Sequence, residues 1–482
     1  MNYSVVIYIL GWIMEIEAAF LALPGIVSAI YGEKGGFAFL WVALGSAVAG
    51  SAIILRKPKN MRFYLREGFV TVALSWILMS VIGCLPFVIN GDIPHFADAL
   101  FEMISGFTTT GATVVSDVEG LTKGSLFWRS FSHWIGGMGV LVFLLAIVPR
   151  AGGSHMNLMK AESPGPSVGK LVPKVRQTAK YLYIIYFALT MIEVIFLLFG
   201  GMNLFEALTT SFGTAGTGGF AIWNDGFVSV SPYNQWVVTI FMLLFGVNFG
   251  FYFLILTGKL RDALKFEEVR IYFIIVIAAA VFIFINLRHF ALYAPAEGIR
   301  QAFFQVASII TTTGFASADF NLWPETSRTI LVLLMFIGAC AGSTGGGIKV
   351  SRFIIACKSF IKEIISYLHP RSVKKIKIEG KPLEHETLRA TNVYFMTYMV
   401  IFAVSVLLVS IENKDLVTNF AAVAATFNNI GPGLSLVGPM ANFGHFTDFT
   451  KYILMFDMLA GRLEIFPMML LFCPAVWKRR RA

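Results

Sequence analysis

The sequence predicts an all-α integral membrane protein, and three observations support that class. First, 57% of its 482 residues are hydrophobic and only 14% are charged, which is more apolar surface than a water-soluble domain can bury. Second, apolar stretches of about 20 residues, long enough to cross a bilayer as helices, recur along the whole chain. Third, Lys and Arg gather in alternate loops between these stretches. The mean hydropathy of +0.73 indicates the same class.

Ten apolar stretches are predicted to cross the membrane. The first begins without a basic segment and has no small-residue cleavage pattern before Pro24, so we expect a retained helix rather than a signal peptide. Helices satisfy all of their backbone hydrogen bonds within lipid, which makes them the expected spanning element. The predicted crossings are residues 4–30, 36–55, 68–90, 127–148, 179–200, 233–257, 270–290, 328–348, 389–411 and 450–476.

The distribution of charge predicts the orientation of the chain. The net charge is +10, but the basic residues do not collect in a polar domain of the kind that binds nucleic acid. By the positive-inside rule the basic loops are cytoplasmic, which places both termini inside. The basic segments are loops 56–67, 149–180, 258–270 and 349–389 and the tail from Lys478. The external loops are then 91–126, 201–232, 291–327 and 412–449.

Each external loop contains a short, mildly apolar segment that ends in Thr or Asn and Gly. These segments are too short to span a bilayer and lie between two predicted crossings, so we interpret them as re-entrant. They run from Phe101 to Gly111, Phe205 to Gly218, Phe304 to Gly314 and Phe420 to Gly431. The chain therefore divides into an amino-terminal two-helix pair, residues 1–60, and four helix–loop–helix repeats. The predicted repeats are residues 61–150, 151–265, 266–385 and 386–482.

The chemistry of the re-entrant segments predicts a pore for a monovalent cation. Non-helical backbone at membrane depth is tolerated where it lines water or is buried in protein, so we expect the four segments to share one cavity. A short helix followed by an extended Thr-Thr-Thr-Gly run offers a cation successive backbone carbonyls in place of its hydration shell. We therefore predict four pseudo-symmetric helix–pore loop–helix repeats around a central ion pore. The candidate filter residues are Thr109, Thr110, Gly111, Gly216, Thr217, Gly218, Thr312, Thr313, Gly314, Asn429, Ile430 and Gly431.

Over essentially its whole length the chain resembles the TrkH-type subunits of the Trk/Ktr/HKT cation transporter superfamily. The resemblance rests on Thr108-Thr-Thr-Gly-Ala-Thr113, Thr311-Thr-Thr-Gly-Phe315, Asn428-Asn-Ile-Gly-Pro-Gly433, Gly342-Ser-Thr-Gly-Gly-Gly-Ile-Lys349 and Gly461-Arg-Leu-Glu-Ile-Phe466. It implies a filter centred on Gly111, Gly218, Gly314 and Gly431. A serine at the first of these positions accompanies sodium selectivity in the superfamily, so Gly111 favours K⁺ as the bound and transported ion. The second repeat departs from the pattern, because Ala215-Gly-Thr-Gly218 has an additional glycine.

The resemblance also implies partners and a location. It implies a homodimer in the bacterial inner membrane and a cytosolic RCK-type (TrkA-like) nucleotide-binding regulatory subunit that docks on the cytoplasmic side. The chain has no GxGxxG or P-loop motif, so we expect any nucleotide to be bound by that partner. We expect no cofactor in this chain.

A gate loop is predicted where Gly342, Ser343, Thr344, Gly345, Gly346 and Gly347 interrupt the eighth apolar stretch. Each glycine lowers helix stability by about 1 kcal/mol relative to alanine, so the helix is expected to break within the membrane. These residues and Lys349 would obstruct the pore and move when it opens, as the family resemblance also implies. A static packing kink is the alternative.

Arg462 lies in the last apolar stretch, where a charge costs roughly 2.5 to 3.5 kcal/mol to insert. The resemblance implies a pore-facing arginine that raises a barrier to the cation. The alternative is a structural arginine paired with Asp457 or Glu464. The sequence assigns no role to the other polar residues in apolar stretches, which are Glu15, Glu17, Glu193 and Asn248.

A coupled carrier and an enzyme are the two other classes of function that compete with a pore. A sodium- or proton-coupled carrier would normally show inverted repeats, whereas four re-entrant segments on one side favour a channel-like pore. A sodium-permeable member of the same superfamily also stays open. An enzyme is not expected, because the histidines are scattered without an HExxH motif and the four cysteines lack metal-ligand spacing.

Overall fold

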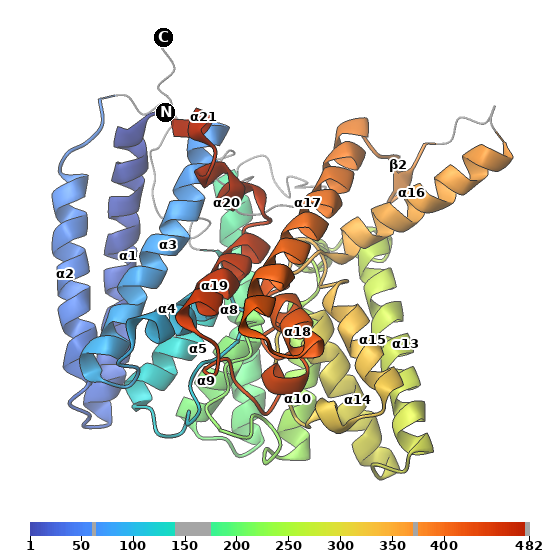
Figure 1. Ribbon diagram of the computed structural model, residues 1–482, viewed down its shortest axis with the longest axis horizontal. Helices are drawn as coiled ribbons and strands as arrows, with labels where there is room; N and C mark the ends of the chain where they lie inside the picture. Colours follow the sequence, from blue (N-terminus) through green and yellow to red (C-terminus); the bar gives the residue numbers. More distant parts are fainter. Residues whose placement is uncertain (60–63, 140–174, 370–374, 478–482) are drawn as a thin grey trace.

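The computed structural model describes residues 1–59, 64–139, 175–369 and 375–477, and these form a helical membrane protein (Figure 1). Strands in these ranges form one short antiparallel hairpin, β1 (Lys377–Ile378) with β2 (Lys381–Pro382). The predicted all-α class is confirmed.

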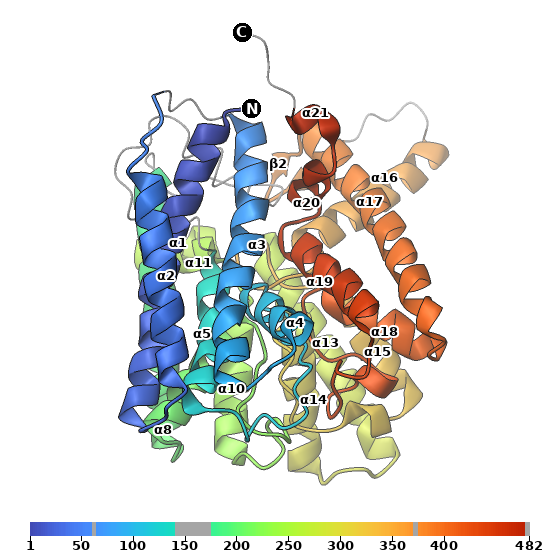
Figure 2. The ribbon, with the colours of Figure 1, turned by 60° about the vertical axis from the view of Figure 1, so that its left-hand side comes forward.

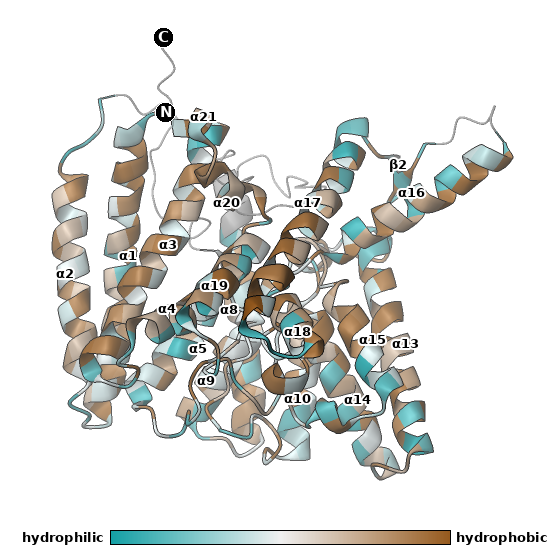
Figure 3. Cartoon of the chain, in the orientation of Figure 1, coloured by the Kyte–Doolittle hydropathy of each residue, from teal (hydrophilic) through white to brown (hydrophobic). Residues whose placement is uncertain are grey.

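Six helices in this part of the chain are long and apolar enough to cross a membrane. Hydrophobic residues predominate along these helices (Figure 3). The helices expose large apolar side chains such as Trp41, Phe196 and Phe282. Such exposure is expected where lipid rather than water surrounds the protein, so the prediction of a multi-pass membrane protein is confirmed. The six are α1 (Tyr3–Ile30), α2 (Gly36–Ile54), α3 (Leu65–Asn90), α8 (Val175–Phe199), α13 (Glu267–His289) and α17 (His385–Val409).

Helices α1 and α2 pack against each other at one edge of the molecule (Figures 1 and 2). Small residues allow the approach: a β-carbon on Gly36 would lie 2.5 Å from that of Ser28, as is typical of helix pairs in membranes. In the turn between them, the Glu33 carboxylate accepts hydrogen bonds from the backbone N–H groups of Lys123 (2.7 Å) and Gly124 (3.2 Å). These residues begin α5 (Lys123–Met138), so the pair is tied to the rest of the fold.

Three predicted crossings are broken helices. Residues 233–257 form α10 (Pro232–Phe245) and α11 (Phe249–Leu256), bent by 89°. The eighth crossing breaks as predicted, between α15 (Glu325–Met335) and α16 (Val350–Leu368). The last forms α19 (Asp448–Arg462), α20 (Phe466–Leu471) and α21 (Pro474–Trp477). The continuous helices predicted over 233–257 and 450–476 are therefore wrong. The crossing at 127–148 begins within α5, and its remainder lies outside the described residues.

Both unpredicted breaks have local causes. The Asn248 side chain accepts a hydrogen bond from the Gly250 N–H at 2.8 Å and so caps the start of α11. Between α19 and α20, Glu464 and Ile465 adopt left-handed φ angles of 54° and 71°. Pro467 lies in the first turn of α20, where its missing N–H leaves no intrahelical bond unmade.

Four short helices lie in the half of the molecule opposite Met1 and α21 (Figure 1). They are α4 (Phe96–Phe107), α9 (Leu204–Gly216), α14 (Pro295–Ile310) and α18 (Leu416–Phe427). Two have side-chain caps: Asn203 and Glu206 form a capping box on α9, and Asp415 accepts from the Thr418 N–H at 2.9 Å on α18. The remaining elements are α12 (Leu260–Ala263) and the 3₁₀ turns η1 (Phe320–Leu322), η2 (Ser410–Glu412) and η3 (Ser435–Val437).

Asp415 provides a test of the α18 cap. Hydrogen bonds from the Thr418 hydroxyl and N–H hold the pKa of Asp415 below its ordinary value. The stabilisation is therefore complete above an ordinary Asp pKa of about 3.9 and is lost as the pH falls through the lower folded-state pKa. We expect Asp415→Ala to destabilise the protein by about 1 kcal/mol at pH 7, with the difference shrinking in strong acid. Thermal unfolding of the purified protein measures this. Asp415→Asn, which keeps the cap, is the control, and equal melting temperatures for the Ala variant and wild type would contradict the assignment.

Candidate functional site

The four short helices α4, α9, α14 and α18 end in the same way. In the turn that follows each helix, one backbone N–H donates a hydrogen bond to the carbonyl five residues earlier, inside the helix, at 2.8 to 2.9 Å. The residue before it takes a left-handed φ of 52° to 58°, as in a Schellman turn. The hydrogen-bonded pairs are Thr110 with Ser105, Gly218 with Gly213, Thr313 with Ser308, and Ile430 with Ala425. The left-handed residues are Thr109, Thr217, Thr312 and Asn429.

This pattern corrects the alignment of the second repeat. Gly218 makes the hydrogen bond that Thr110 makes in the first repeat, so it is not the counterpart of Gly111. The counterpart is Gly219, whose φ of 81° compares with 78° at Gly111, 87° at Gly314 and 96° at Gly431. The segment equivalent to Thr109–Gly111 is therefore 217–219 rather than the predicted 216–218.

The structure brings the four glycines together in a closed ring. A β-carbon on any one of them would collide with a backbone carbonyl oxygen of the next segment, at 1.9 to 2.6 Å. Side chains are thus excluded from the positions where the four backbones meet. The contacts run from Gly111 to the carbonyl of Gly218, from Gly219 to Thr313, from Gly314 to Ile430, and from Gly431 to Thr110.

The additional glycines of the second repeat make room for His133 of α5. A β-carbon on Gly218 would lie 2.1 Å from the His133 ring, and one on Gly216 would lie 2.2 Å from the His133 carbonyl oxygen. The ring Nδ1 lies 2.8 Å from the Gly106 carbonyl, and Nε2 accepts from the Phe220 N–H at 3.3 Å. These two bonds require a neutral imidazole with its proton on Nδ1. His133 therefore links the first and second segments.

The other segments have different polar supports. Threonine hydroxyls pair within the first segment (Thr108 with Thr110, 2.8 Å) and within the third (Thr311 with Thr313, 2.7 Å). In the fourth, the Asn429 amide donates to the Thr110 hydroxyl at 3.0 Å and to the Met458 carbonyl at 2.8 Å. The fourth segment is thereby joined to the first.

The predicted gate loop lies against the ends of α14 and α18. Residues 336–349, between α15 and α16, are not helical. The Gly346 N–H donates to the Thr312 hydroxyl at 2.6 Å. A β-carbon on Gly345 would lie 3.0 Å from the Thr311 carbonyl oxygen, and one on Gly346 would lie 3.0 Å from that of Asn428. Glycine at these positions therefore lets the loop backbone approach two of the four segments.

Groups from three other helices hold this loop. Its backbone bonds with the break between α10 and α11: the Cys340 N–H donates to the Gly246 carbonyl (3.1 Å), and the Phe249 N–H donates to that of Gly342 (2.9 Å). Ser343 donates its hydroxyl to the Cys340 carbonyl at 2.6 Å. At the start of α13, one carboxylate oxygen of Glu268 accepts from the N–H groups of Ala341 within the loop (2.7 Å) and of Ser351 in the first turn of α16 (2.9 Å).

Two cations bind carbonyl oxygens of the loop. The Lys349 ammonium donates to the Gly345 and Gly346 carbonyls, and Gly347 beside it has a φ of 67°. The Arg462 guanidinium donates to the Thr344 carbonyl at 2.8 Å and, across the molecule, to those of Gly136 (2.5 Å) and Gly137 (3.0 Å) in α5.

The alternative partners of Arg462 have bonds of their own. Glu464 forms an ion pair with Arg352 of α16, and Asp457 accepts from the Ser405 hydroxyl at 2.7 Å. Arg462 itself lies at the last turn of α19 rather than inside a continuous span. This position lets it reach both the loop and α5.

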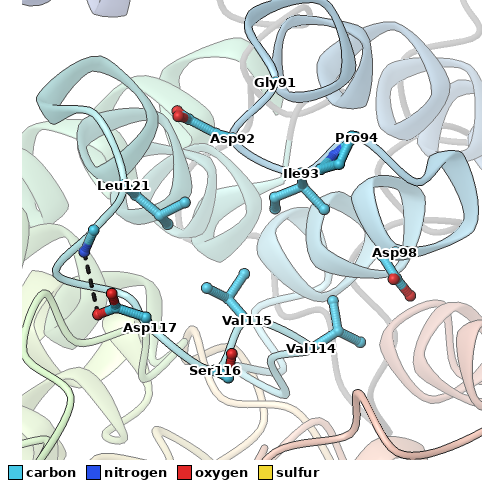
Figure 4. Close-up of a pocket in the computed structure, with 11 residues that line it drawn as sticks. Gly91, Asp92, Ile93, Pro94, Asp98, Val114, Val115, Ser116, Asp117 and Leu121 are labelled. Atoms are coloured by element: carbon cyan, nitrogen blue, oxygen red, sulfur yellow. Dashed lines mark hydrogen bonds between the residues drawn. The ribbon is translucent and has the colours of Figure 1, made fainter.

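A pocket of about 390 Å³ opens beside the segment that follows Gly111 (Figure 4). Three carboxylates line it, those of Asp92, Asp98 and Asp117. Asp98 accepts from the Lys451 ammonium at 2.5 Å, and Asp92 accepts from the Thr122 hydroxyl at 2.6 Å. Acidic groups gathered in this way favour cations over anions.

Sequence reasoning missed Glu102, Arg129, His133 and Glu268, which are all buried. Arg129 lies inside the predicted crossing 127–148. A charged residue in such a run was the available signal. Of the unassigned polar residues, Asn248 is a helix cap and Glu15 accepts from the Ser51 hydroxyl at 2.6 Å. Glu17 and Glu193 are fully buried.

The long apolar helices, the broken helices and the converging ends of four short helices define a membrane transport protein. Comparison with known proteins agrees: the TrkH model, described as a cation transport protein, matches residues 37–479. The chain therefore belongs to the TrkH family. It is 36% identical to the Trk system potassium uptake protein TrkH of Escherichia coli K12 over 99% of this chain and all of that protein. It is 31% identical to the Trk system potassium uptake protein TrkG of the same strain, over 99% of both.

A solved structure shares the fold. The crystal structure of the potassium transporter TrkH from Vibrio parahaemolyticus superimposes with a TM-score of 0.89 at 32% sequence identity, over 99% of this chain and all of that one. The expectation of a transporter rather than an enzyme is thus confirmed by the family.

The ring predicts a difference between two glycine substitutions. Gly219 and Gly201 have similar φ angles, 81° and 86°, but Gly201 faces open space. A left-handed alanine costs about 1–2 kcal/mol at either position. Gly219→Ala should cost clearly more, because its methyl group would lie 2.0 Å from the Thr313 carbonyl oxygen. Thermal unfolding of both variants measures the difference, and equal stabilities would refute the placement of Gly219 in the ring.

Proposed function

We propose that the chain takes up potassium through a channel-like pore whose selectivity filter is formed by residues 109–111, 217–219, 312–314 and 429–431. The observation that supports this best is the closed ring of glycines, in which each backbone packs against the next without a side chain between them. Backbone carbonyls gathered in this way can replace the hydration shell of a cation. Potassium is the proposed ion because the relatives compared above are potassium uptake proteins.

The helices around the ring favour a cation as well. α4, α9, α14 and α18 all end at the ring, so the negative ends of four helix dipoles point to one place. The acidic pocket beside the first segment adds negative charge at the same end of the molecule. An anion would be disfavoured by both.

We further propose that residues 336–349 are the gate and that the arrangement described above is its closed position. Gly345 and Gly346 lie against the carbonyls that end α14 and α18, so the loop blocks the path beneath the filter. Lys349 and Arg462 supply positive charge at this place, which opposes the passage of K⁺. Opening would require the Arg462–Thr344 and Gly346–Thr312 bonds to break.

The proposed function includes an orientation in the membrane and two partners. Met1, α16, α21 and the β hairpin lie at one end of the molecule, on the side away from the short helices (Figure 1). We propose that this end is cytoplasmic, in the bacterial inner membrane. We also propose that two copies of the chain form a homodimer in that membrane. A cytosolic RCK-type regulatory subunit would dock on the cytoplasmic end. A sodium- or proton-coupled carrier is the competing function.

Tracer flux into liposomes tests the function directly. Purified protein should carry K⁺ faster than Na⁺ down equal gradients, with no requirement for a second ion. Gly111→Ser should lower this preference, because a β-carbon there would displace the Gly218 carbonyl, 2.0 Å away. K⁺ flux that ceases without a sodium or proton gradient would make the protein a carrier instead.

Arg462 provides the test of the gate. Arg462→Ala removes both the cation and the bond to the Thr344 carbonyl, so K⁺ flux in the same liposomes should rise several-fold. Lys265→Ala, which removes an exposed cation of the Lys265–Asp262 pair, should leave flux unchanged. K⁺ flux through the Arg462 variant at or below the wild-type level would refute the proposed barrier.

A further inference from the structure

A buried ion pair lies directly behind the first two filter segments. Glu102 of α4 and Arg129 of α5 have side-chain exposures of 0% and 2%. The guanidinium Nε and Nη2 lie 2.8 and 2.7 Å from the same carboxylate oxygen. The two residues come from the helices on either side of the first segment, so the pair spans that segment.

Glu102 holds the chain as it leaves the first segment. Its carboxylate accepts from the Thr113 hydroxyl at 2.9 and 3.1 Å and from the Val114 N–H at 3.0 Å. Thr113 is two residues beyond Gly111, and its carbonyl accepts from the Phe443 N–H at 2.8 Å. The carboxylate thereby fixes the exit from the first segment, against which the loop after the fourth segment is bound.

Arg129 extends the same network to the second segment. Its guanidinium donates to the Ala221 carbonyl at 3.4 Å and lies 4.2 Å from the centre of the Phe220 ring. Phe220 follows Gly219 and donates its N–H to His133. The ion pair therefore connects the exits of two neighbouring segments.

The other repeats differ at the equivalent position, seven residues before the left-handed residue. The third repeat has Gln305 there. With its amide oxygen facing the loop, Gln305 accepts from the Ser317 N–H at 2.9 Å, which is the counterpart of the Val114 bond. The second and fourth repeats have Thr210 and Ala422. A neutral amide can thus accept the backbone hydrogen bond that Glu102 accepts in the first repeat. Of the four equivalent residues, only Glu102 is acidic.

We propose that Glu102 and Arg129 are positioning residues for cation selectivity, which hold the first and second filter segments in register with each other. The inference rests on the proposed filter. A buried ion pair is weak evidence for stability, because apolar residues can often replace it without loss. The Glu102 carboxylate also accepts hydrogen bonds from Thr113 and Val114, and the Arg129 guanidinium donates to the chain that follows the second segment. These bonds indicate that the pair fixes the positions of the two segments.

Three variants test the proposal through the K⁺/Na⁺ flux ratio in liposomes. Glu102→Gln and Arg129→Gln each leave one buried charge unpaired, so each should lower the ratio about tenfold. Their effects on K⁺ flux should have opposite signs, since the first leaves a positive charge near the filter and the second a negative one. Glu102→Gln/Arg129→Gln removes both charges and keeps an amide like that of Gln305, so its ratio should recover to within about threefold of wild type.

A milder variant covers the case in which the single variants fail to fold. Thr113→Val removes the hydroxyl bound by Glu102 and keeps the ion pair, so it should lower the ratio several-fold. Glu325→Gln, in the exposed Arg328–Glu325 pair, is the control and should leave the ratio unchanged.

The outcomes separate this inference from the proposed function. Wild-type protein without K⁺ preference would overturn the filter itself. With wild-type selectivity intact, an unchanged ratio in the Glu102, Arg129 and Thr113 variants would overturn the positioning role, even if their melting temperatures fell. A double variant no better than the single ones would overturn the pairing.

Discussion

The close approach of four backbones around one axis is the constraint on which the rest of the structure depends. None of the four ring glycines has room for a β-carbon beside the carbonyl of its neighbour. The segments can meet in this way because the four helices end in the same turn, which forces Thr or Asn into the left-handed region. Such strain costs of the order of 1–3 kcal/mol per residue and persists only where the surroundings hold it. Helix α5 supplies much of that support, because it places His133, Gly136 and Arg129 behind the first two segments.

The broken helices follow from a related constraint. A break within the membrane leaves backbone groups that cost several kcal/mol each if unbonded. Here the breaks satisfy one another: the loop after α15 bonds with the gap between α10 and α11, and Arg462 at the end of α19 donates to the same loop. A straight helix over residues 233–257 would leave the Cys340 N–H and the Gly342 carbonyl without these partners. The breaks are therefore interdependent.

Hydropathy and glycine runs predict the fold class and the long helices, because these depend on local sequence. Combined with the cost of unbonded backbone in lipid, they also predict that Gly111, Gly314 and Gly431 converge. They do not predict the register of the second segment. Residues 216, 218 and 219 are all glycine, and the choice among them depends on His133, which lies in another helix. The break at Asn248 is missed for a similar reason: its cap is local, but the backbone groups that it frees are bonded by Cys340 and Gly342 of a distant loop. Arg129 is recognisable as a buried charge once Glu102 is known to face it.

The backbone of the candidate filter is nearly fourfold symmetric, whereas its side-chain support is not. Paired threonines brace the first and third segments, His133 braces the second, and Asn429 joins the fourth to Thr110. A pore made of four identical chains must place the same group behind every segment. A single chain with four repeats is free to vary each one. The ring of glycines imposes the geometry that all four segments share, so differences in how firmly each segment is held must come from the residues behind them. The Glu102–Arg129 pair, present behind one segment and replaced by Gln305 behind another, is such a difference, and it places charged groups behind one segment and a neutral amide behind the other.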